Sequence, residues 1–257
     1  MTGLLTVLRG GWLLPFVLSM TAGAVDVIGF LALDGLFTAH ITGNLVVLAV
    51  HYVTGGFCEV GPLLSVPVFI AVLGVVLLVC GRAGKAGHGS RRALLALHAA
   101  LLAGYLGLGV GFGPFPNADR ALAVFAGMLG VAAMATQNAL VRLALSGVPS
   151  TAVMTTNITQ LAIDLAALAG GRGDPDDLAW YRRQAGLTFL CVVGFVAGCA
   201  VGAALEFRCG LWALALPVVL AVLAVPLGEL WDERRAEQTS YGRDQGRIPG
   251  GHPVPIG

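Results

Sequence analysis

Charged residues are scarce in this sequence. Asp, Glu, Lys and Arg make up 11% of its 257 residues, whereas soluble domains carry about a quarter. No lysine or arginine occurs between residues 10 and 81, and the formal net charge is only +1. Nucleic acid is therefore excluded as an expected partner, because its binding needs a basic surface. Disorder is excluded for most of the chain, because it requires low hydrophobicity and high charge.

Sequence motifs for catalysis or metal binding are also missing. The five cysteines are spaced unlike zinc or haem motifs, and several lie in apolar runs, where cysteine packs as a small hydrophobe: Cys58, Cys80, Cys191, Cys199 and Cys209. No Ser–His–Asp set or paired carboxylate motif is recognisable. We therefore expect no catalytic residues, no metal and no cofactor, and we expect that the chain is not an enzyme.

Apolar residues are abundant instead, at 57% of the chain, and the mean hydropathy is +0.85. These values predict an all-α polytopic membrane protein whose main partner is the lipid bilayer. The apolar stretches are approximately 11–33, 38–54, 62–81, 92–113, 121–145, 150–169, 184–205 and 209–229. Six are long enough to span a bilayer. Stretches 38–54 and 150–169 open with polar residues, and only about 10–12 apolar helical residues remain, roughly half a hydrocarbon core.

The distribution of basic residues separates two topologies. If all eight stretches cross from a cytoplasmic amino terminus, nine of the 15 lysines and arginines lie inside and six outside. If stretches 38–54 and 150–169 enter and leave on the same side, 13 lie inside, and only Arg120 and Arg208 lie outside. The positive-inside rule favours the second topology. It predicts six transmembrane helices, two re-entrant half-helices and two cytoplasmic termini.

An internal repeat supports this topology. Asp26 to Gly35 (DVIGFLALDG) aligns with Asn138 to Gly147 (NALVRLALSG), and TAHITGNLVVLAV, starting at Thr38, aligns with TAVMTTNITQLAI, starting at Thr151. Ten of the 23 aligned pairs are identical. Each repeat contains three crossings, an odd number, so the second repeat must be inverted relative to the first.

The repeats define the domain organisation. We expect a single transmembrane domain over residues 1–231, with repeat 1 at about 11–113 and repeat 2 at about 120–230. Residues 232–257 are polar and predict a disordered cytoplasmic tail. An apolar run before Ala22-Gly23-Ala24 resembles a signal peptide. We expect no cleavage there, because it would cut the opening helix of the first repeat.

The amino ends of the two half-helices are the candidate substrate-binding site. In an inverted repeat they meet near the bilayer midplane, where such folds bind ligands. Two helix dipoles pointing at one place favour an anion, a carboxylate or a polar neutral solute. The candidate residues are Thr42, Gly43 and Asn44 in the first repeat, and Thr155, Thr156 and Asn157 in the second. The alternative is that these side chains only cap the half-helices.

Ionisable side chains inside the apolar stretches are the candidates for proton coupling, because a charge within a bilayer is costly and usually functional. They are Asp26, Asp164 and His40, and Gln137 and Asn138, the repeat mate of Asp26, are candidate site-lining residues. The alternative for the acids is a structural role in holding helices together. The alternative for His40 is a buried histidine with its hydrogen bonds satisfied.

Glycines spaced four residues apart occur at Gly194, Gly198 and Gly202, and more glycines lie between Gly104 and Gly113. Such small-residue faces predict close packing of helices, within one chain or between subunits of a homo-oligomer.

Three of these segments carry a family resemblance: SMTAGAVD ending at Asp26, TAHITGN ending at Asn44, and QNA starting at Gln137. Together they resemble the YoaK-like family of bacterial inner-membrane proteins, over nearly the whole chain apart from the tail. The second repeat departs from the motif, with Thr156 where Gly43 stands in the first. The resemblance implies one domain and a multi-pass location in the bacterial inner (plasma) membrane. It implies no established substrate or activity.

The expected function is passage of a small polar or anionic solute, by a carrier or a channel. A membrane-embedded enzyme and a non-transporting membrane scaffold are the alternatives. An enzyme would turn over its substrate in detergent without two compartments, whereas a scaffold would keep its cellular role without Asn44 and Asn157.

Overall fold

The computed structural model describes residues 11–54, 60–82, 88–145, 147–171 and 174–245, and the regular structure of these residues is helical. The helices are α2 (Leu13–Ala32), α3 (Ile41–Thr54), α4 (Val60–Arg82), α5 (His88–Phe112), α6 (Ala121–Ala144), α7 (Met154–Gly170), α8 (Pro175–Cys209), the short 3-10 helix η1 (Gly210–Leu214) and α9 (Ala215–Gln245). The order agrees with the eight predicted apolar stretches.

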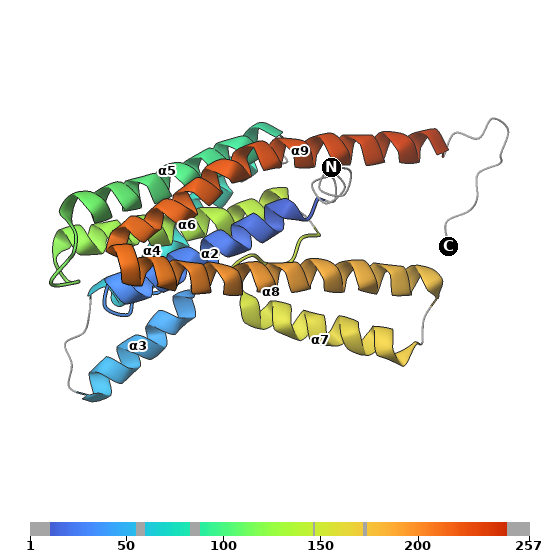
Figure 1. The fold of residues 1–257 in the computed structure, drawn as a ribbon. Helices are drawn as coiled ribbons and strands as arrows, with labels where there is room; N and C mark the ends of the chain where they lie inside the picture. Colours follow the sequence, from blue (N-terminus) through green and yellow to red (C-terminus); the bar gives the residue numbers. More distant parts are fainter. Residues whose placement is uncertain (1–10, 55–59, 83–87, 146, 172–173, 246–257) are drawn as a thin grey trace.

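Five ranges in the described part of the chain are long and apolar enough to cross a membrane, so the protein has the helices of a multi-pass membrane protein. Four of them fall on α2, α4, α5 and α6, and the fifth, Asp177–Trp231, contains both α8 and α9. These two helices run in opposite directions (Figure 1). With 14 and 17 residues, α3 and α7 are about 21 and 26 Å long, shorter than the hydrocarbon core of about 30 Å.

Helices α2 and α6 form the centre of the bundle, since 72% of each apolar window is buried, compared with 11% in α4. Helix α2 packs against α8 and α9, and α6 packs against α4 and α5. Helices α3 and α7 pack against α4 and α8, respectively. Both project from the same side of the bundle, and they run toward opposite ends of it (Figure 1).

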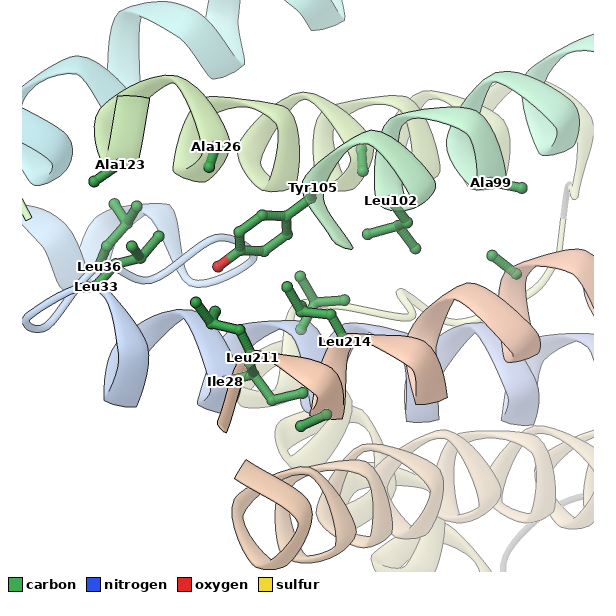
Figure 2. Close-up of a cluster of buried hydrophobic side chains, with 14 residues drawn as sticks. Ile28, Leu33, Leu36, Ala99, Leu102, Tyr105, Ala123, Ala126, Leu211 and Leu214 are labelled. Carbon is green, nitrogen blue, oxygen red and sulfur yellow. The ribbon is translucent and has the colours of Figure 1, made fainter. Parts of the chain in front are cut away.

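A buried cluster around Tyr105 of α5 anchors the loop that leads into α3. Leu33 and Leu36 of this loop lie in the same cluster as Tyr105, and the ring points toward them (Figure 2). Gly130 makes room for this packing, because a Cβ there would lie 3.1 Å from Cε1 of Tyr105 and 3.0 Å from Cγ2 of Thr38. The loop is therefore fixed by the bundle before α3 begins.

The glycines of α8 pack against α2 within this chain. A Cβ at Gly194 would lie 2.8 Å from the carbonyl oxygen of Phe16, and one at Gly198 would overlap the carbonyl oxygen of Met20. This confirms the predicted close packing and assigns it to one subunit. The second set of glycines is less uniform, since a Cβ at Gly107 would meet no atom within 4 Å.

Helix α9 continues to Gln245, so the first 14 residues of the segment 232–257 are helical. The sequence from Asp232 to Gln238 contains no glycine or proline and is rich in Glu, Arg and Ala, which favour helix. The polar composition therefore does not end the helix at Trp231, where the apolar stretch ends. Residues 246–257 lie outside the described part.

Candidate functional site

The loops that precede α3 and α7 meet inside the bundle. Ala39 of the first loop and Ala152 of the second lie in one buried cluster with Ala22 of α2 and Met134 of α6. In the repeat alignment, Ala39 pairs with Ala152, and Ala22 and Met134 each lie four residues before the aligned pair Asp26 and Asn138. The structure thus brings together the two segments that the sequence singles out. We call this region the loop junction.

Asn44 and Asn157 bind their own loops in the same way. Nδ2 of Asn44 donates to the carbonyl oxygen of Phe37 at 2.8 Å, and Nδ2 of Asn157 donates to the carbonyl oxygen of Ser150 at 2.6 Å. Each bond spans seven residues, and both asparagines are buried. These amides therefore clamp each loop against the first turn of its helix, the capping role that was the alternative reading of the sequence.

The first clamp contains more hydrogen bonds than the second. Oδ1 of Asn44 also accepts from the backbone N–H of Phe37 at 2.9 Å, and Nδ2 also donates to Oγ of Ser65 at 2.8 Å. Both amide hydrogens of Asn44 are thus used within the chain. Ser65 could not be predicted as a partner of Asn44 from the sequence, because it lies 21 residues away on another helix.

This difference predicts unequal effects of alanine substitution. Asn44→Ala removes three hydrogen bonds, worth about 1 kcal/mol each, so we expect a loss of about 3 kcal/mol, compared with about 1 kcal/mol for Asn157→Ala. The melting temperatures of the two purified variants in the same detergent show which variant loses more stability. Equal melting temperatures for the two variants would contradict the assigned clamps.

Asp26 holds the start of α3 with a single carboxylate oxygen. Its Oδ1 accepts from the backbone N–H groups of Thr38, Ala39 and His40 at 2.8, 2.7 and 3.2 Å. The side chain is 4% exposed. A negative charge is stabilised at a helix amino terminus, and here this chain's own carboxylate takes that position. The end of α3 is thus already occupied by a carboxyl oxygen of this chain.

The second repeat has no equivalent of this carboxylate. Asn138, the mate of Asp26, donates instead to the carbonyl oxygen of Met134 at 2.9 Å. Its neighbour Gln137 ties the second loop down, because Nε2 donates to Oγ1 of Thr151 at 2.9 Å and to the carbonyl oxygen of Leu18 at 3.0 Å. The two helix ends therefore differ electrostatically, and only the α3 end carries a carboxylate.

Other predicted residues lie on the outside of the single chain. His40, Thr42, Thr155 and Thr156 are exposed, although they lie beside the buried clamps. Gly43 is packed under an aromatic ring, since a Cβ there would lie 2.9 Å from Cδ2 of Phe37. Thr156 can replace glycine at the equivalent position because its side chain faces outward.

Asp164 is not part of the loop junction. It lies seven residues beyond Asn157 on α7, roughly 10 Å farther along the helix. The side chain is fully buried, Oδ1 accepts from Nε2 of Gln160 at 2.8 Å, and Oδ2 has no hydrogen-bond partner. Across the described ranges, His, Cys, Asp and Glu nowhere gather in a group of three that could hold a metal ion.

Comparison with known proteins supplies a family. The family model described as "Protein of unknown function (DUF1275)" matches residues 14–227, a range that includes both loops and both clamps. The chain belongs to this family. Residues 14–227 of the DUF1275 protein also contain all five candidate spans apart from their outer ends. Because the family is described as one of unknown function, membership in it assigns no activity to the chain.

One curated relative of this DUF1275 protein is the UPF0700 transmembrane protein YoaK of Bacillus subtilis (strain 168). The two sequences are 38% identical over 65 residues, which cover a quarter of each chain. The relative and the apolar helices together identify a transmembrane protein. No solved structure matches the chain.

Proposed function

We propose that this protein transports a small polar solute across the membrane, by a carrier or channel mechanism, through the loop junction. The observation that carries the proposal is that the amino ends of two short helices meet inside a bundle of long apolar helices. Irregular backbone at membrane depth is tolerated where it is buried in protein or lines an aqueous cavity. Proteins that carry such broken helices commonly bind solutes at these ends.

The proposal includes an inverted repeat with six crossings, and the helix pairing supports it. The first repeat contains α2 to α5 and the second contains α6 to α9, in the same order. When each helix is replaced by its repeat mate, the contact between α2 and α8 becomes the contact between α6 and α4, which is also present. The pairs α3–α4 and α7–α8 also exchange, as do α2–α9 and α6–α5. Helices α3 and α7 run away from the junction toward opposite ends of the bundle (Figure 1). This is the arrangement expected of two repeats of opposite orientation.

The two helix ends suggest how a solute is held. At α3 the carboxylate of Asp26 already accepts the free N–H groups. At α7 the acceptor is a neutral hydroxyl instead, because Oγ of Ser150 accepts from the backbone N–H groups of Ala152 and Val153 at 3.4 and 3.0 Å. We therefore propose that the electron-rich group of a neutral or anionic solute faces the α7 end, beside Thr155 and Thr156. Protons or other coupling ions would then act through Asp26 or Asp164.

Solute flux tests this proposal. Purified protein is reconstituted into liposomes, and the entry of urea, glycerol, formate and acetate is followed by stopped-flow light scattering. We expect faster entry of at least one solute than into empty liposomes. A Thr155→Val, Thr156→Val double variant removes two hydroxyls with little change in volume, and we expect it to lose most of that flux.

Thr54→Val is the matched control, because it removes an exposed hydroxyl at the far end of α3, where the side chain binds its own helix. It should transport like the unaltered protein. Equal flux in the double variant and the control would contradict the assigned site. Absence of flux for every solute would contradict transport itself and would favour a scaffold.

Sidedness tests the topology. Thr54, the last residue of α3, and Gly89, in the first turn of α5, serve as reporter positions. A single cysteine is placed at each in a cysteine-free background, and intact cells are labelled with an impermeant thiol reagent. The six-crossing topology predicts labelling at Thr54 and none at Gly89. Eight crossings predict the reverse at both positions.

A further inference from the structure

Gln137 of α6 carries a buried oxygen that the loop junction does not use. Its Nε2 donates to Oγ1 of Thr151 at 2.9 Å and to the carbonyl oxygen of Leu18 at 3.0 Å. Its Oε1 is fully buried and has no hydrogen-bond donor among the residues that the structure describes. A buried carbonyl without a donor is uncommon, because the hydrogen bonds it made to water are lost without replacement.

The orientation of this amide is fixed by its partners. A backbone carbonyl can only accept, so the nitrogen of Gln137, and not its oxygen, must face Leu18. Thr151 receives the second bond from the same nitrogen, which leaves Oε1 pointing away from both partners. An amide oxygen can only accept hydrogen bonds. The group that pairs with Oε1 must therefore bring an N–H or an O–H.

The amide of Gln137 lies where the two loops meet. Met134, three residues earlier on α6, lies in the same buried cluster as Ala152 of the second loop. Thr151, the partner of Gln137, directly precedes Ala152 and lies four residues before Thr155. The amide thus adjoins both the centre of the loop junction and the α7 end, to which the proposed function assigns the solute.

The first loop holds a second oxygen of this kind. Thr38, the repeat mate of Thr151, is fully buried, and its Oγ1 has no hydrogen-bond partner in the described part of the chain. In the first repeat Val25 directly precedes Asp26, at the position that Gln137 has in the second. An apolar side chain there cannot donate to Thr38. Each loop of the junction therefore has one buried oxygen beside it that can accept from a solute.

Positive charge is almost missing from the same region. Helices α2, α3, α6 and α7 and the loops 33–40 and 145–153 contain a single Lys or Arg, Arg142, which is exposed in the last turn of α6. The carboxyl of Asp26 lies at the α3 end. An anionic solute at the junction would therefore lose its water without gaining a buried cation, which is costly.

We propose that Oε1 of Gln137 accepts a hydrogen bond from the solute, so that the loop junction selects small neutral solutes with an N–H or O–H donor, such as amides, over carboxylates. This selection rests on the proposed function, whose solute it narrows to one class. An amide suits both sides of the site, because its carbonyl oxygen faces the α7 end while its N–H reaches Gln137. A carboxylate has no donor and would leave Oε1 unpaired.

The entry of acetamide and acetate into liposomes tests this selection. The two solutes have nearly the same size and shape, and they differ in carrying an N–H donor or a negative charge. Rates are measured at neutral pH and corrected for empty liposomes, and their ratio does not depend on the amount of protein inserted. We expect acetamide to enter about tenfold faster than acetate, or more, because a buried acceptor disfavours a solute without a donor.

Three variants assign the preference to Oε1. Gln137→Met removes the acceptor with little change in volume, and we expect the ratio of the two rates to fall about fivefold to tenfold. Thr151→Val removes the bond between Gln137 and the second loop but keeps Oε1, so it should lose stability and keep the preference. Gln184→Met, the matched control, makes the same change at a half-buried residue of α8 and should keep both.

Entry of acetate as fast as that of acetamide, or an unchanged ratio in Gln137→Met, would overturn the selection and leave transport standing. An equal loss of preference in Thr151→Val would also overturn it, because Gln137 would then act only by holding the loop. Absence of protein-dependent entry for acetamide, acetate, urea and glycerol would overturn the proposed function itself. The unaltered protein alone gives the first of these results, so the test does not depend on the folding of a variant.

Discussion

Asp26→Ala is expected to remove most of the folded protein. The substitution leaves the backbone N–H groups of Thr38, Ala39 and His40 without their acceptor. Each buried unsatisfied group costs about 1–3 kcal/mol, so the three together cost about 3–9 kcal/mol, comparable with the whole stability of many domains. Yield and melting temperature of the detergent-solubilised protein measure this loss.

Two further variants separate the carboxylate's structural role from its charge. Asp26→Asn keeps an acceptor oxygen in place and should retain an intermediate stability, since only the charge-assisted strength of the bonds is lost. Asp34→Asn makes the same change at an exposed residue just after α2 and should melt like the unaltered protein. If the Asp26→Ala variant has the same melting temperature as the Asp34→Asn variant, Asp26 does not organise the start of α3.

The sequence singled out Asp26 correctly as an unusual residue but could not assign its partners. A carboxylate within an apolar helix is costly, and that alone marks it as important. Its three donors lie 12 to 14 residues ahead in a loop, and the path of that loop depends on Leu33 and Leu36 packing around Tyr105. Proton coupling through Asp26 stays a prediction beside this structural role.

Repeats made the two asparagines easier to predict than their surroundings. Thr-x-Asn recurs at Asn44 and Asn157, and the structure gives both amides the same bond to a loop carbonyl. Thr151 could have been found in the same way, since it aligns with Thr38. The contact between Gln137 and Leu18 could not, because it joins residues 119 positions apart, and such pairs depend on how the helices cross.

Helix order was predictable because apolar stretches of about 20 residues have few alternatives to helix in a membrane. Helix lengths were not, since α8 begins at Pro175, before the apolar stretch 184–205, and α3 and α7 have 14 and 17 residues rather than about 10–12. The outer boundary of the last helix was not, because α9 continues through charged residues after Trp231. Hydropathy predicts which part of a helix lies in the membrane, whereas the end of a helix in water depends on helix propensity and capping. For the same reason, glycine spacing predicted close packing but did not identify α2 as the partner of α8.

The packing of α8 on α2 gives the second large prediction. Substitution by alanine is expected to destabilise the protein at one glycine and to stabilise it slightly at another. At Gly198 a single added methyl group would overlap the carbonyl oxygen of Met20 and lie 3.0 Å from the backbone nitrogen of Ala24. Backbone atoms cannot move aside as a side chain can, so α2 and α8 must separate. We expect Gly198→Ala to cost about 3 kcal/mol or more, at the upper end of overpacking effects, and to lower both yield and melting temperature.

Gly107→Ala is the matched control, because it makes the same chemical change inside a helix where a Cβ meets no atom within 4 Å. Alanine is favoured over glycine within a helix by about 0.5–1 kcal/mol, so this variant should melt slightly above the unaltered protein. A helix-propensity effect alone would stabilise both variants, whereas the packing described here destabilises only Gly198→Ala. Stabilisation by Gly198→Ala would therefore show that α2 and α8 do not approach through this glycine face.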